Sequence, residues 1–343
     1  MGGNSMANDS MDDDQSASAT QLLDFEPDTA TFYDDVIEGL GRQPRSLPCK
    51  YFYDERGSQL FEQICELDEY YVTRTELAIM RRHAADMARQ IGQGVMLVEY
   101  GSGASIKTRL LLDELIDPVA YVPVDISREH LQQSAAHLAG LFPDIEVLPV
   151  CADFTDDFSL PESKRKPTHN AVYFPGSTIG NFQPEEAKRM LAQIVELCGC
   201  GGGLLLGIDL QKETRVLEAA YNDAEGVTAA FNLNLLDRIN RELDGDIQTD
   251  QFEHHAEYNA DKNRVELSLV SLRNQTATVG DTEFEFGEGE LIHTEHSHKY
   301  TIDGFAELAA EVGLTLRQHW TDADRRFAVL HLVILDESDS QQG

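Results

Sequence analysis

The chain has 343 residues, and its 61 Asp and Glu residues outnumber its 27 Lys and Arg residues, for a formal net charge of -34 at pH 7. Such a length allows one enlarged domain or two. The acidic balance disfavours nucleic-acid and anionic-membrane partners, because both are bound through basic side chains that neutralise phosphates. Five cysteines without a metal-binding spacing indicate a reduced, cytoplasmic protein with no metal site. No apolar run reaches the ~18–20 residues of a membrane span.

The first part of the chain is expected to be helical after a polar start. Residues 1–20 are rich in Asp, Ser and Asn, which predicts a disordered tail. From 24 to 74, helical spacings of apolar residues alternate with turn residues, and a longer helix is expected over 75–91. The tail and these helices precede the first strand pattern.

A regular alternation of strands and helices follows. Helices are predicted between short apolar runs that read as buried parallel strands, at 95–100, 119–124, 145–151, 170–174 and 203–209. The intervening helices are expected over 105–116, 128–140 and 184–198. This order predicts an α/β fold with a doubly wound parallel sheet.

The alternation is interrupted and then resumes. Residues 214–243 have a helical pattern, and antiparallel strands are expected over 251–258, 264–273 and 283–295. A helix over 302–312 and strands over 314–321 and 326–336 then complete the first sheet. The interruption predicts a second α+β domain, made of 21–74 and 211–297, beside a sheet domain made of 75–210 and 298–337.

A glycine-rich loop ends the first predicted strand and opens a helix. Gly101, Ser102 and Gly103 let a ligand approach the backbone near the positive end of that helix. Ile106 stands where the dinucleotide fingerprint has its third glycine, which favours a cofactor without a pyrophosphate. S-adenosylmethionine fits best. The alternative is an ordinary tight turn.

Acidic residues follow the next two strands. Asp125 stands where a carboxylate would accept the ribose hydroxyls, and Asp153 and Phe154 could bind and cover an adenine. Taken singly, Asp125 could be a helix cap and Asp153 a turn residue. Since the carboxyl ends of parallel strands meet at one edge, the three positions together predict a nucleoside-type cofactor.

Longer motifs carry a resemblance to a known family. They lie at 52–61, 67–76, 99–107, 175–182, 221–232 and 294–299 and resemble the bacterial L-histidine Nα-methyltransferases of the ergothioneine pathway. The resemblance covers about 30–335. It implies a class I methyltransferase domain that binds S-adenosylmethionine, a substrate-binding second domain, and three methylations of histidine to hercynine. Fungal enzymes that methylate tryptophan-like amines share the wider family.

The resemblance also implies substrate-side roles. Asn181 and Tyr221 would hold the amino-acid head group, and the Gly176 carbonyl would approach the amine. Tyr53 would lie near the reacting nitrogen and the cofactor, and Tyr70 would wall the pocket. An amide and a phenol suit a zwitterion, because together they offer donors and acceptors without a further full charge. Tyr53 could otherwise be a core tyrosine, and Asn181 a helix cap before the next helix.

Histidine recognition is expected from one strand. Glu295 and Ser297 alternate, so their side chains share a face, and in the family they bind the imidazole. The alternative is a solvated surface strand. Leu267 stands where the family has methionine beside the ring, a change that conserves volume. Lys107 is implied as a further cofactor contact.

Methyl transfer to an amine is an in-line displacement that needs alignment more than a strong base. Tyr53, Gly176 and Asn181 are the residues expected to align the amine. The alternative functions are N-methylation of another free amino acid or an aromatic amine such as tryptophan, and a non-catalytic binding protein on the same fold. The glycine loop and its acidic followers favour the enzyme.

Overall fold

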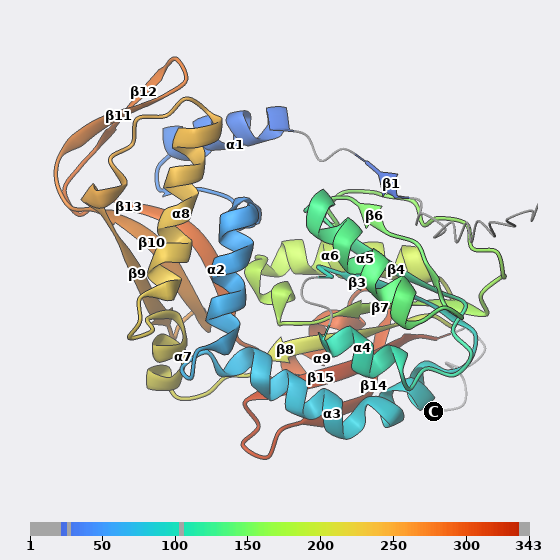
Figure 1. Ribbon diagram of the computed structural model, residues 1–343. Coiled ribbons are helices and arrows are strands. Elements are labelled where there is room, and N and C mark those ends of the chain that lie inside the picture. The colour runs from blue at the N-terminus through green and yellow to red at the C-terminus, as the bar shows by residue number, and fades with distance from the viewer. Residues whose placement is uncertain (1–21, 26–28, 103–105, 336–343) are drawn as a thin grey trace, which may run out of the picture.

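The computed structural model describes residues 22–25, 29–102 and 106–335 of the chain (Figure 1). The predicted tail at 1–20 lies outside these ranges. A nine-stranded sheet runs in the order β1-β6-β4-β3-β7-β8-β15-β14, with β5 paired to β4. Its strands are β1 Leu23–Asp24, β3 Val95–Tyr100, β4 Ala120–Asp125, β5 Glu146–Val147, β6 Val150–Cys151, β7 His169–Phe174, β8 Gly203–Asp209, β14 Leu314–Thr321 and β15 Phe327–Ile334.

The direction of the strands confirms the predicted fold class. Neighbouring strands from β6 to β8 are parallel, whereas β15 is antiparallel to both β8 and β14. A parallel sheet with one reversed strand, β15, lying between β8 and β14 is the sheet of a class I methyltransferase. Within the three described ranges, no helix combines the length and apolar composition needed to cross a bilayer.

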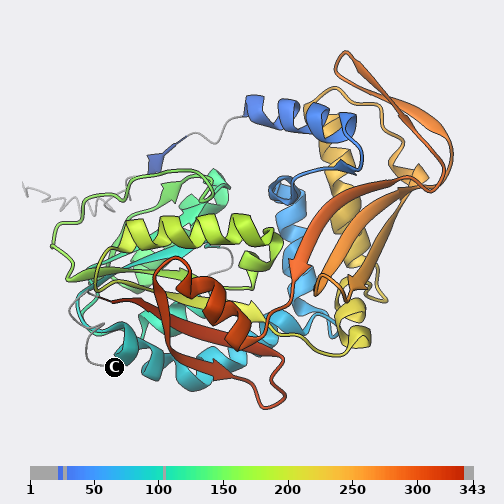
Figure 2. The same ribbon diagram turned by 180° about the vertical axis from the view of Figure 1, so that it is seen from behind.

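Helices cover both faces of this sheet (Figures 1 and 2). Alternate side chains of a strand point to opposite faces, so Leu97 packs in one apolar core and Val98 in another. The Leu97 side carries α3 Tyr71–Ile91, α4 Ile106–Leu112 and α5 Arg128–Leu141. The Val98 side carries α6 Pro184–Cys198 and α9 Ile302–Ala310. Burial on both faces explains the continuous apolar runs.

A second sheet of four strands lies beside the carboxyl end of the first. Its order is β2-β13-β10-β9, with β2 Arg45–Ser46, β9 Phe252–Asn259, β10 Arg264–Ser271 and β13 Leu291–His298. A separate hairpin is formed by β11 Gln275–Val279 and β12 Thr282–Phe286, and the helices of this region are α1 Thr29–Gly41, α2 Glu55–Glu66, α7 Thr214–Tyr221 and α8 Val227–Glu242. Figure 2 shows this sheet and α8 forming a lobe of their own. Three 3₁₀ turns, η1 Cys49–Phe52, η2 Thr178–Asn181 and η3 Thr249–Gln251, connect elements within the described residues.

The two lobes share a core. Phe32, Leu236 and Val265 from the second lobe belong to the same buried apolar cluster as Met80 and Leu97. In addition, β1 lies in the segment assigned to the second domain but pairs with β6 of the large sheet. The division of the chain into two domains therefore stays a prediction.

Three expected elements are divided in the structure. The strand expected over 145–151 is two short strands, because Pro149 lacks the N–H needed for a continuous ladder. The helical stretch 214–243 is two helices, because α7 ends at Tyr221 and α8 begins only after Gly226, whose φ of 74° is outside the helical region. The strand expected over 283–295 is parts of β12 and β13, separated by a turn around Gly289 at φ 78°.

A close backbone contact positions the turn η2. A Cβ added to Gly180 would lie 2.8 Å from the carbonyl oxygen and 3.2 Å from the nitrogen of His298, which ends β13. Only glycine allows this approach without displacing one of the two backbones. The contact sets the position of the neighbouring Asn181 relative to the second sheet.

Gly180→Ala is therefore expected to lower the free energy of unfolding by about 1–3 kcal/mol, the usual range for overpacking. Gly140→Ala in α5 is the control, because nothing lies within 4 Å of its added Cβ. That variant is expected to be as stable as the parent or more stable by about 0.5–1 kcal/mol. Urea denaturation measures both, and equal stability of the two variants would contradict the packing argument.

Candidate functional site

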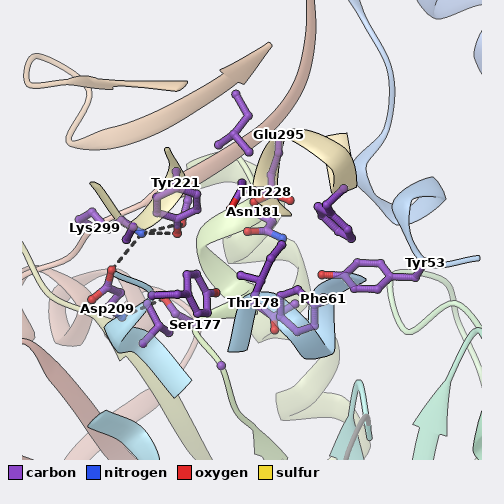
Figure 3. A pocket seen from close by; sticks show the side chains of 18 residues that line it. Tyr53, Phe61, Ser177, Thr178, Asn181, Asp209, Tyr221, Thr228, Glu295 and Lys299 are labelled. Atoms are coloured by element: carbon purple, nitrogen blue, oxygen red, sulfur yellow. Dashed lines mark hydrogen bonds and ion pairs between the residues drawn. The ribbon is translucent and has the colours of Figure 1, made fainter. Parts of the chain in front are cut away.

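The candidate site is a pocket between the carboxyl edge of the large sheet and the second sheet (Figure 3). Its volume, which opens to solvent, is about 600 Å³. It is lined by Tyr53, Phe61, Ile64, Tyr70, Val72, Gly176, Ser177, Thr178, Asn181, Asp209, Ala220, Tyr221, Thr228, Phe231, Leu267, Glu295, Ser297 and Lys299. The lining combines an apolar and aromatic wall with a few polar groups, as small-molecule sites do.

All substrate-side residues named from the sequence meet in this one pocket. They are Tyr53, Tyr70, Gly176, Asn181, Tyr221, Leu267, Glu295 and Ser297. They come from segments as far apart in the sequence as Tyr53, after η1, and β13, so the fold and not their nearness in the chain brings them together. Their roles toward a substrate stay predictions.

Asn181 ends η2 and projects into the pocket (Figure 3). The cap of α6 is Gln183 instead, which forms a reciprocal capping box with Glu186. The alternative interpretation of Asn181 as that cap is therefore wrong. Its amide lies on the pocket wall, within reach of a ligand.

Tyr53 follows η1, and its hydroxyl projects into the pocket (Figure 3). Its ring packs edge-on against Phe61 at 5.6 Å and Phe231 at 5.8 Å between centroids. Burial, followed by the charge of Glu295, raises the pKa of Tyr53 well above its usual value. The phenol is therefore neutral rather than a phenolate, and its hydroxyl can donate or accept a hydrogen bond.

Glu295 and Ser297 both line the pocket, as their alternation on β13 predicts. Leu267 is the direct cross-strand neighbour of Glu295, so the carboxylate lies beside an aliphatic side chain. Burial raises the pKa of Glu295 to about 7, although the charge of Lys299 acts in the opposite direction. The alternative of a solvated surface strand is wrong for these two side chains.

The loop after β7 is held from two sides. Gly176, at φ 78°, donates its N–H to Glu76 over 2.9 Å. Ser177 is left-handed at φ 60°, and its hydroxyl accepts the N–H of Asp209 at 2.8 Å. A left-handed non-glycine residue costs about 1–3 kcal/mol unless its surroundings hold it. These bonds provide that support and define where the Gly176 peptide lies.

Two pocket residues missed in the sequence form its charged end. The Lys299 ammonium donates to the Tyr221 hydroxyl at 2.9 Å and the Ser297 hydroxyl at 2.6 Å, and it lies 3.0 Å from an Asp209 carboxylate oxygen. The sequence did contain a local indication of both residues. Lys299 continues the alternation of Glu295 and Ser297, and Asp209 ends a parallel strand.

The cofactor-side residues gather at the carboxyl ends of β3, β4 and β6. Gly101 has a φ of 70° and Ser102 is buried, whereas Gly103 lies outside the described residues. Among the described cofactor-side residues, Tyr53 alone also lines the substrate pocket. The charges of both Glu295 and Asp125 reach its hydroxyl, after burial as the main influence on its pKa. Tyr53 therefore lies between the substrate pocket and the cofactor-side residues.

The two aspartates that follow β4 and β6, Asp125 and Asp153, have hydrogen-bond partners close to them in the chain. Asp125 accepts the N–H of Ser127 at 2.9 Å, and Ser127 rather than Asp125 is the residue before α5. Asp153 accepts the N–H of Thr155 at 3.0 Å and forms a 3.4 Å ion pair with Lys50. The turn interpretation thus describes part of what Asp153 does, without excluding a ligand.

Aromatic and basic groups complete this side. Phe154 stacks on Tyr100 with centroids 5.2 Å apart and planes 11° apart. Lys107 forms a 2.5 Å ion pair with the buried Glu76, the same carboxylate that accepts from Gly176. Glu76 therefore connects the helix after the glycine loop with the loop that lines the substrate pocket. Among the described residues, no group of three His, Cys, Asp or Glu could hold a metal ion.

Comparison with known proteins agrees with this geometry. A family described as histidine-specific methyltransferase, SAM-dependent, matches residues 32–334. The chain belongs to this family. The histidine N-alpha-methyltransferases of Mycolicibacterium smegmatis and Mycobacterium tuberculosis are 42% and 39% identical to it, each over 84% of this chain and 90% of the relative. A 4-dimethylallyltryptophan N-methyltransferase of Epichloe festucae var. lolii is 26% identical over 85% of this chain and 93% of the relative.

Family membership confirms the resemblance and the enzyme class inferred from the sequence, and with them the S-adenosylmethionine dependence. It leaves the alternative of a non-catalytic binding protein without support. The more distant relative is named for a substrate related to tryptophan rather than for histidine.

The buried Glu295 generates a prediction about stability. Its pKa is about 7 in the folded protein and 4.5 for a solvated glutamate in an unfolded chain, so between these values the unfolded chain releases a proton that the folded chain keeps. Stability contributed by this proton is present below pH 4.5 and lost as pH rises to about 7. Glu295→Gln should therefore have a higher Tm than the parent at pH 8, with the difference shrinking toward pH 5.

Thermal denaturation of the ligand-free protein between pH 5 and pH 8.5 measures this difference. Glu225→Gln, at an exposed glutamate before α8, is the control and should follow the parent throughout. A difference in Tm for Glu295→Gln that does not vary with pH would contradict the burial of a titrating carboxylate.

Proposed function

We propose that this protein transfers methyl groups from S-adenosylmethionine to the α-amino group of L-histidine, repeating the step to give the trimethylated betaine hercynine of the ergothioneine pathway. The observation that carries the proposal is the single pocket in which a buried carboxylate and hydroxyl lie together with an amide and two phenols. These groups complement the imidazole and the zwitterionic head group of one small molecule.

The head group is assigned to the large-sheet side. The Asn181 amide donates to the substrate carboxylate, the Tyr221 hydroxyl lies beside this head group, and the Gly176 carbonyl accepts from the amine. Support comes from the fixed positions of these groups, since Gly180 packs on β13 and the Gly176 N–H is bound to Glu76. Positioning of this kind supplies most of what an in-line displacement requires.

The ring is assigned to β13 and β10. The Glu295 carboxylate accepts one imidazole N–H, the Ser297 hydroxyl bonds the other ring nitrogen, and Leu267 packs against the ring edge. Tyr70 closes the wall, with its ring 6.1 Å from that of Tyr221. A carboxylate with a pKa of about 7 is ionised readily when an N–H donor replaces the water it has lost.

The catalytic assignment needs no strong base. When bound, the cofactor supplies an electrophilic methyl group whose sulfur leaves with the bonding electron pair. Tyr53, Gly176 and Asn181 hold the neutral amine with its lone pair directed at that carbon. The methylated ammonium then loses a proton to solvent before the next transfer. The neutral Tyr53 hydroxyl is a hydrogen-bond partner for the amine and reaches toward the cofactor side.

The cofactor is assigned to the carboxyl edge of the large sheet. Gly101, Ser102 and Gly103 form the backbone cradle, and Asp125 binds the ribose. The remaining contacts are Asp153 with Phe154 at the adenine and Lys107 and Tyr53 near the methionine part. Support comes from the left-handed Gly101, the flat Phe154 ring and the position of Asp125 at the end of β4.

The second candidate function is N-methylation of another free amino acid or an aromatic amine such as tryptophan. The Epichloe relative favours it, whereas Glu295 and Ser297 favour histidine. We also propose a cytoplasmic location and a small-molecule substrate without nucleic-acid or membrane partners, since all five cysteines are free thiols and the net charge is -34. A monomer suffices for this proposal, since the pocket residues come from one chain.

Asp125→Ala is expected to weaken S-adenosylhomocysteine binding by about 1.5–3 kcal/mol, the range for hydrogen bonds to a charged group. Isothermal titration calorimetry measures the affinity. Asp113→Ala, at an exposed aspartate after α4, is the control and should bind like the parent. Unchanged affinity in Asp125→Ala would refute the ribose assignment.

Glu295→Ala is expected to lower kcat/KM for histidine by about 30- to 1,000-fold, because a buried imidazole N–H then loses a charge-assisted bond worth about 2–4 kcal/mol. Activity on tryptophan should fall far less or rise, since an unpaired buried carboxylate penalises an apolar ring. Mass spectrometry of reactions with a panel of free amino acids, followed by kcat/KM for histidine and tryptophan, tests this.

Glu225→Ala is the matched control and should keep the parent's ratio of the two kcat/KM values. If the parent prefers tryptophan, or if Glu295→Ala leaves the ratio unchanged, the histidine assignment is wrong and the second candidate function replaces it. Counting the methyl groups on the product in the same spectra tests the proposed trimethylation.

A further inference from the structure

Lys299 follows β13 and is 2% exposed. Its ammonium has three hydrogens, and it has three oxygen partners. They are the hydroxyls of Tyr221 and Ser297, at 2.9 and 2.6 Å, and the carboxylate of Asp209, at 3.0 Å. Every hydrogen of the ammonium is therefore directed at a protein atom, and Figure 3 shows the Tyr221 and Asp209 contacts at one end of the pocket.

Counting hydrogens limits what the two hydroxyls can offer a ligand. Each of them accepts from Lys299, and their oxygens are 2.7 Å apart, so one of them also donates to the other. Two hydroxyl hydrogens are available, and one lies between the oxygens. One hydrogen remains for the pocket.

We propose that Lys299 is a positioning residue that holds Tyr221 and Ser297 as a coupled pair with one hydrogen for the substrate. The proposal rests on the proposed function. Because the pair accepts from a cation, its remaining O–H is polarised and seeks an acceptor, which in the proposed function is the unprotonated ring nitrogen beside Ser297. With Glu295 accepting from the opposite side, the pocket selects a neutral imidazole with one N–H and one lone pair.

The charge of Lys299 is maintained by its surroundings. Asp209 is fully buried and also accepts from Lys212 at 2.6 Å and from the Tyr71 hydroxyl at 2.7 Å. Two lysines thus share one carboxylate, so the Lys299 charge lies behind the hydroxyl pair while the Glu295 carboxylate lies elsewhere on the pocket wall. The Lys299 charge favours an acceptor at the pair and disfavours an imidazolium there.

A purely structural role is the competing explanation, because the Lys299 and Asp209 pair also joins the two sheets. The roles differ in what they affect. A structural role would affect cofactor binding and substrate binding together, whereas a positioning role acts through Ser297 and Tyr221 on the substrate alone.

Lys299→Met tests the proposal without leaving Asp209 as an unpaired buried charge, since Asp209 keeps Lys212 and Tyr71 as partners. We expect the KM for histidine to rise about 10- to 100-fold, the effect of losing one or two oriented hydrogen bonds. The affinity for S-adenosylhomocysteine should stay within about twofold. Lys262→Met, at an exposed lysine before β10, is the control and should match the parent.

A double-mutant cycle supplies the second measurement. Ser297→Ala should raise the KM for histidine about tenfold in the parent but less than about threefold in Lys299→Met, because the hydroxyl is no longer oriented there. If Lys299→Met does not purify, Lys299→Gln replaces it in both measurements. Its amide N–H groups can bond two of the three partners, so its KM should lie between those of the parent and Ser297→Ala.

Additive effects of the two substitutions, or an equal loss of histidine and S-adenosylhomocysteine binding, would overturn the proposal. The first would show that Lys299 does not act through Ser297, and the second would show a structural role. A parent that does not methylate histidine contradicts the proposed function. A parent that does so, with an unchanged KM in Lys299→Met, contradicts this inference alone.

Discussion

The ion pair between Lys299 and Asp209 joins the ends of two strands from different sheets. Lys299 follows β13 of the second sheet and Asp209 ends β8 of the large one, and their charged atoms are 3.0 Å apart in a buried setting. The backbone adds two bonds at the same place, from Tyr300 to Asp209 and from Gln211 to Tyr300, both 3.0 Å long. The ion pair and these two backbone bonds hold the two sheets together at this point. The pocket lies between these two sheets.

Two further features connect the cofactor-side residues with the substrate-side residues. The carboxyl ends of the parallel strands supply the cofactor-side residues, and η1 places Tyr53 between them and the second sheet. Glu76 connects the two sides underneath, because it accepts from both Lys107 and Gly176. One buried carboxylate thus bonds both the helix after the glycine loop and the loop that lines the substrate pocket.

The role proposed for Glu295 in selecting a polar ring has a cost in the free protein. Glu295 is held beside Leu267 without a hydrogen-bond partner among the described residues, and its pKa of about 7 reflects that burial. A glutamine there would be more stable and less selective. The same group penalises an apolar ring, since binding one would leave the carboxylate without water or a donor. Instability of the empty site and rejection of the wrong substrate have one physical origin.

The sequence by itself determined the succession of parallel strands along the chain and, through its motifs, the substrate-side residues that line the pocket apart from Lys299 and Asp209. Strand ends and side-chain alternation are local properties, so Asp125, Glu295 and Ser297 could be placed from neighbouring residues alone. The tertiary structure decided which groups pair across the fold. The contact of Lys299 with Asp209 joins residues 90 positions apart (299 - 209), and Gln183 rather than Asn181 caps α6. The pairing of β1 with β6 and the turns that divide three expected elements were likewise decided there. Such contacts depend on how segments far apart in the chain pack against one another, and a local pattern of residues does not specify that packing.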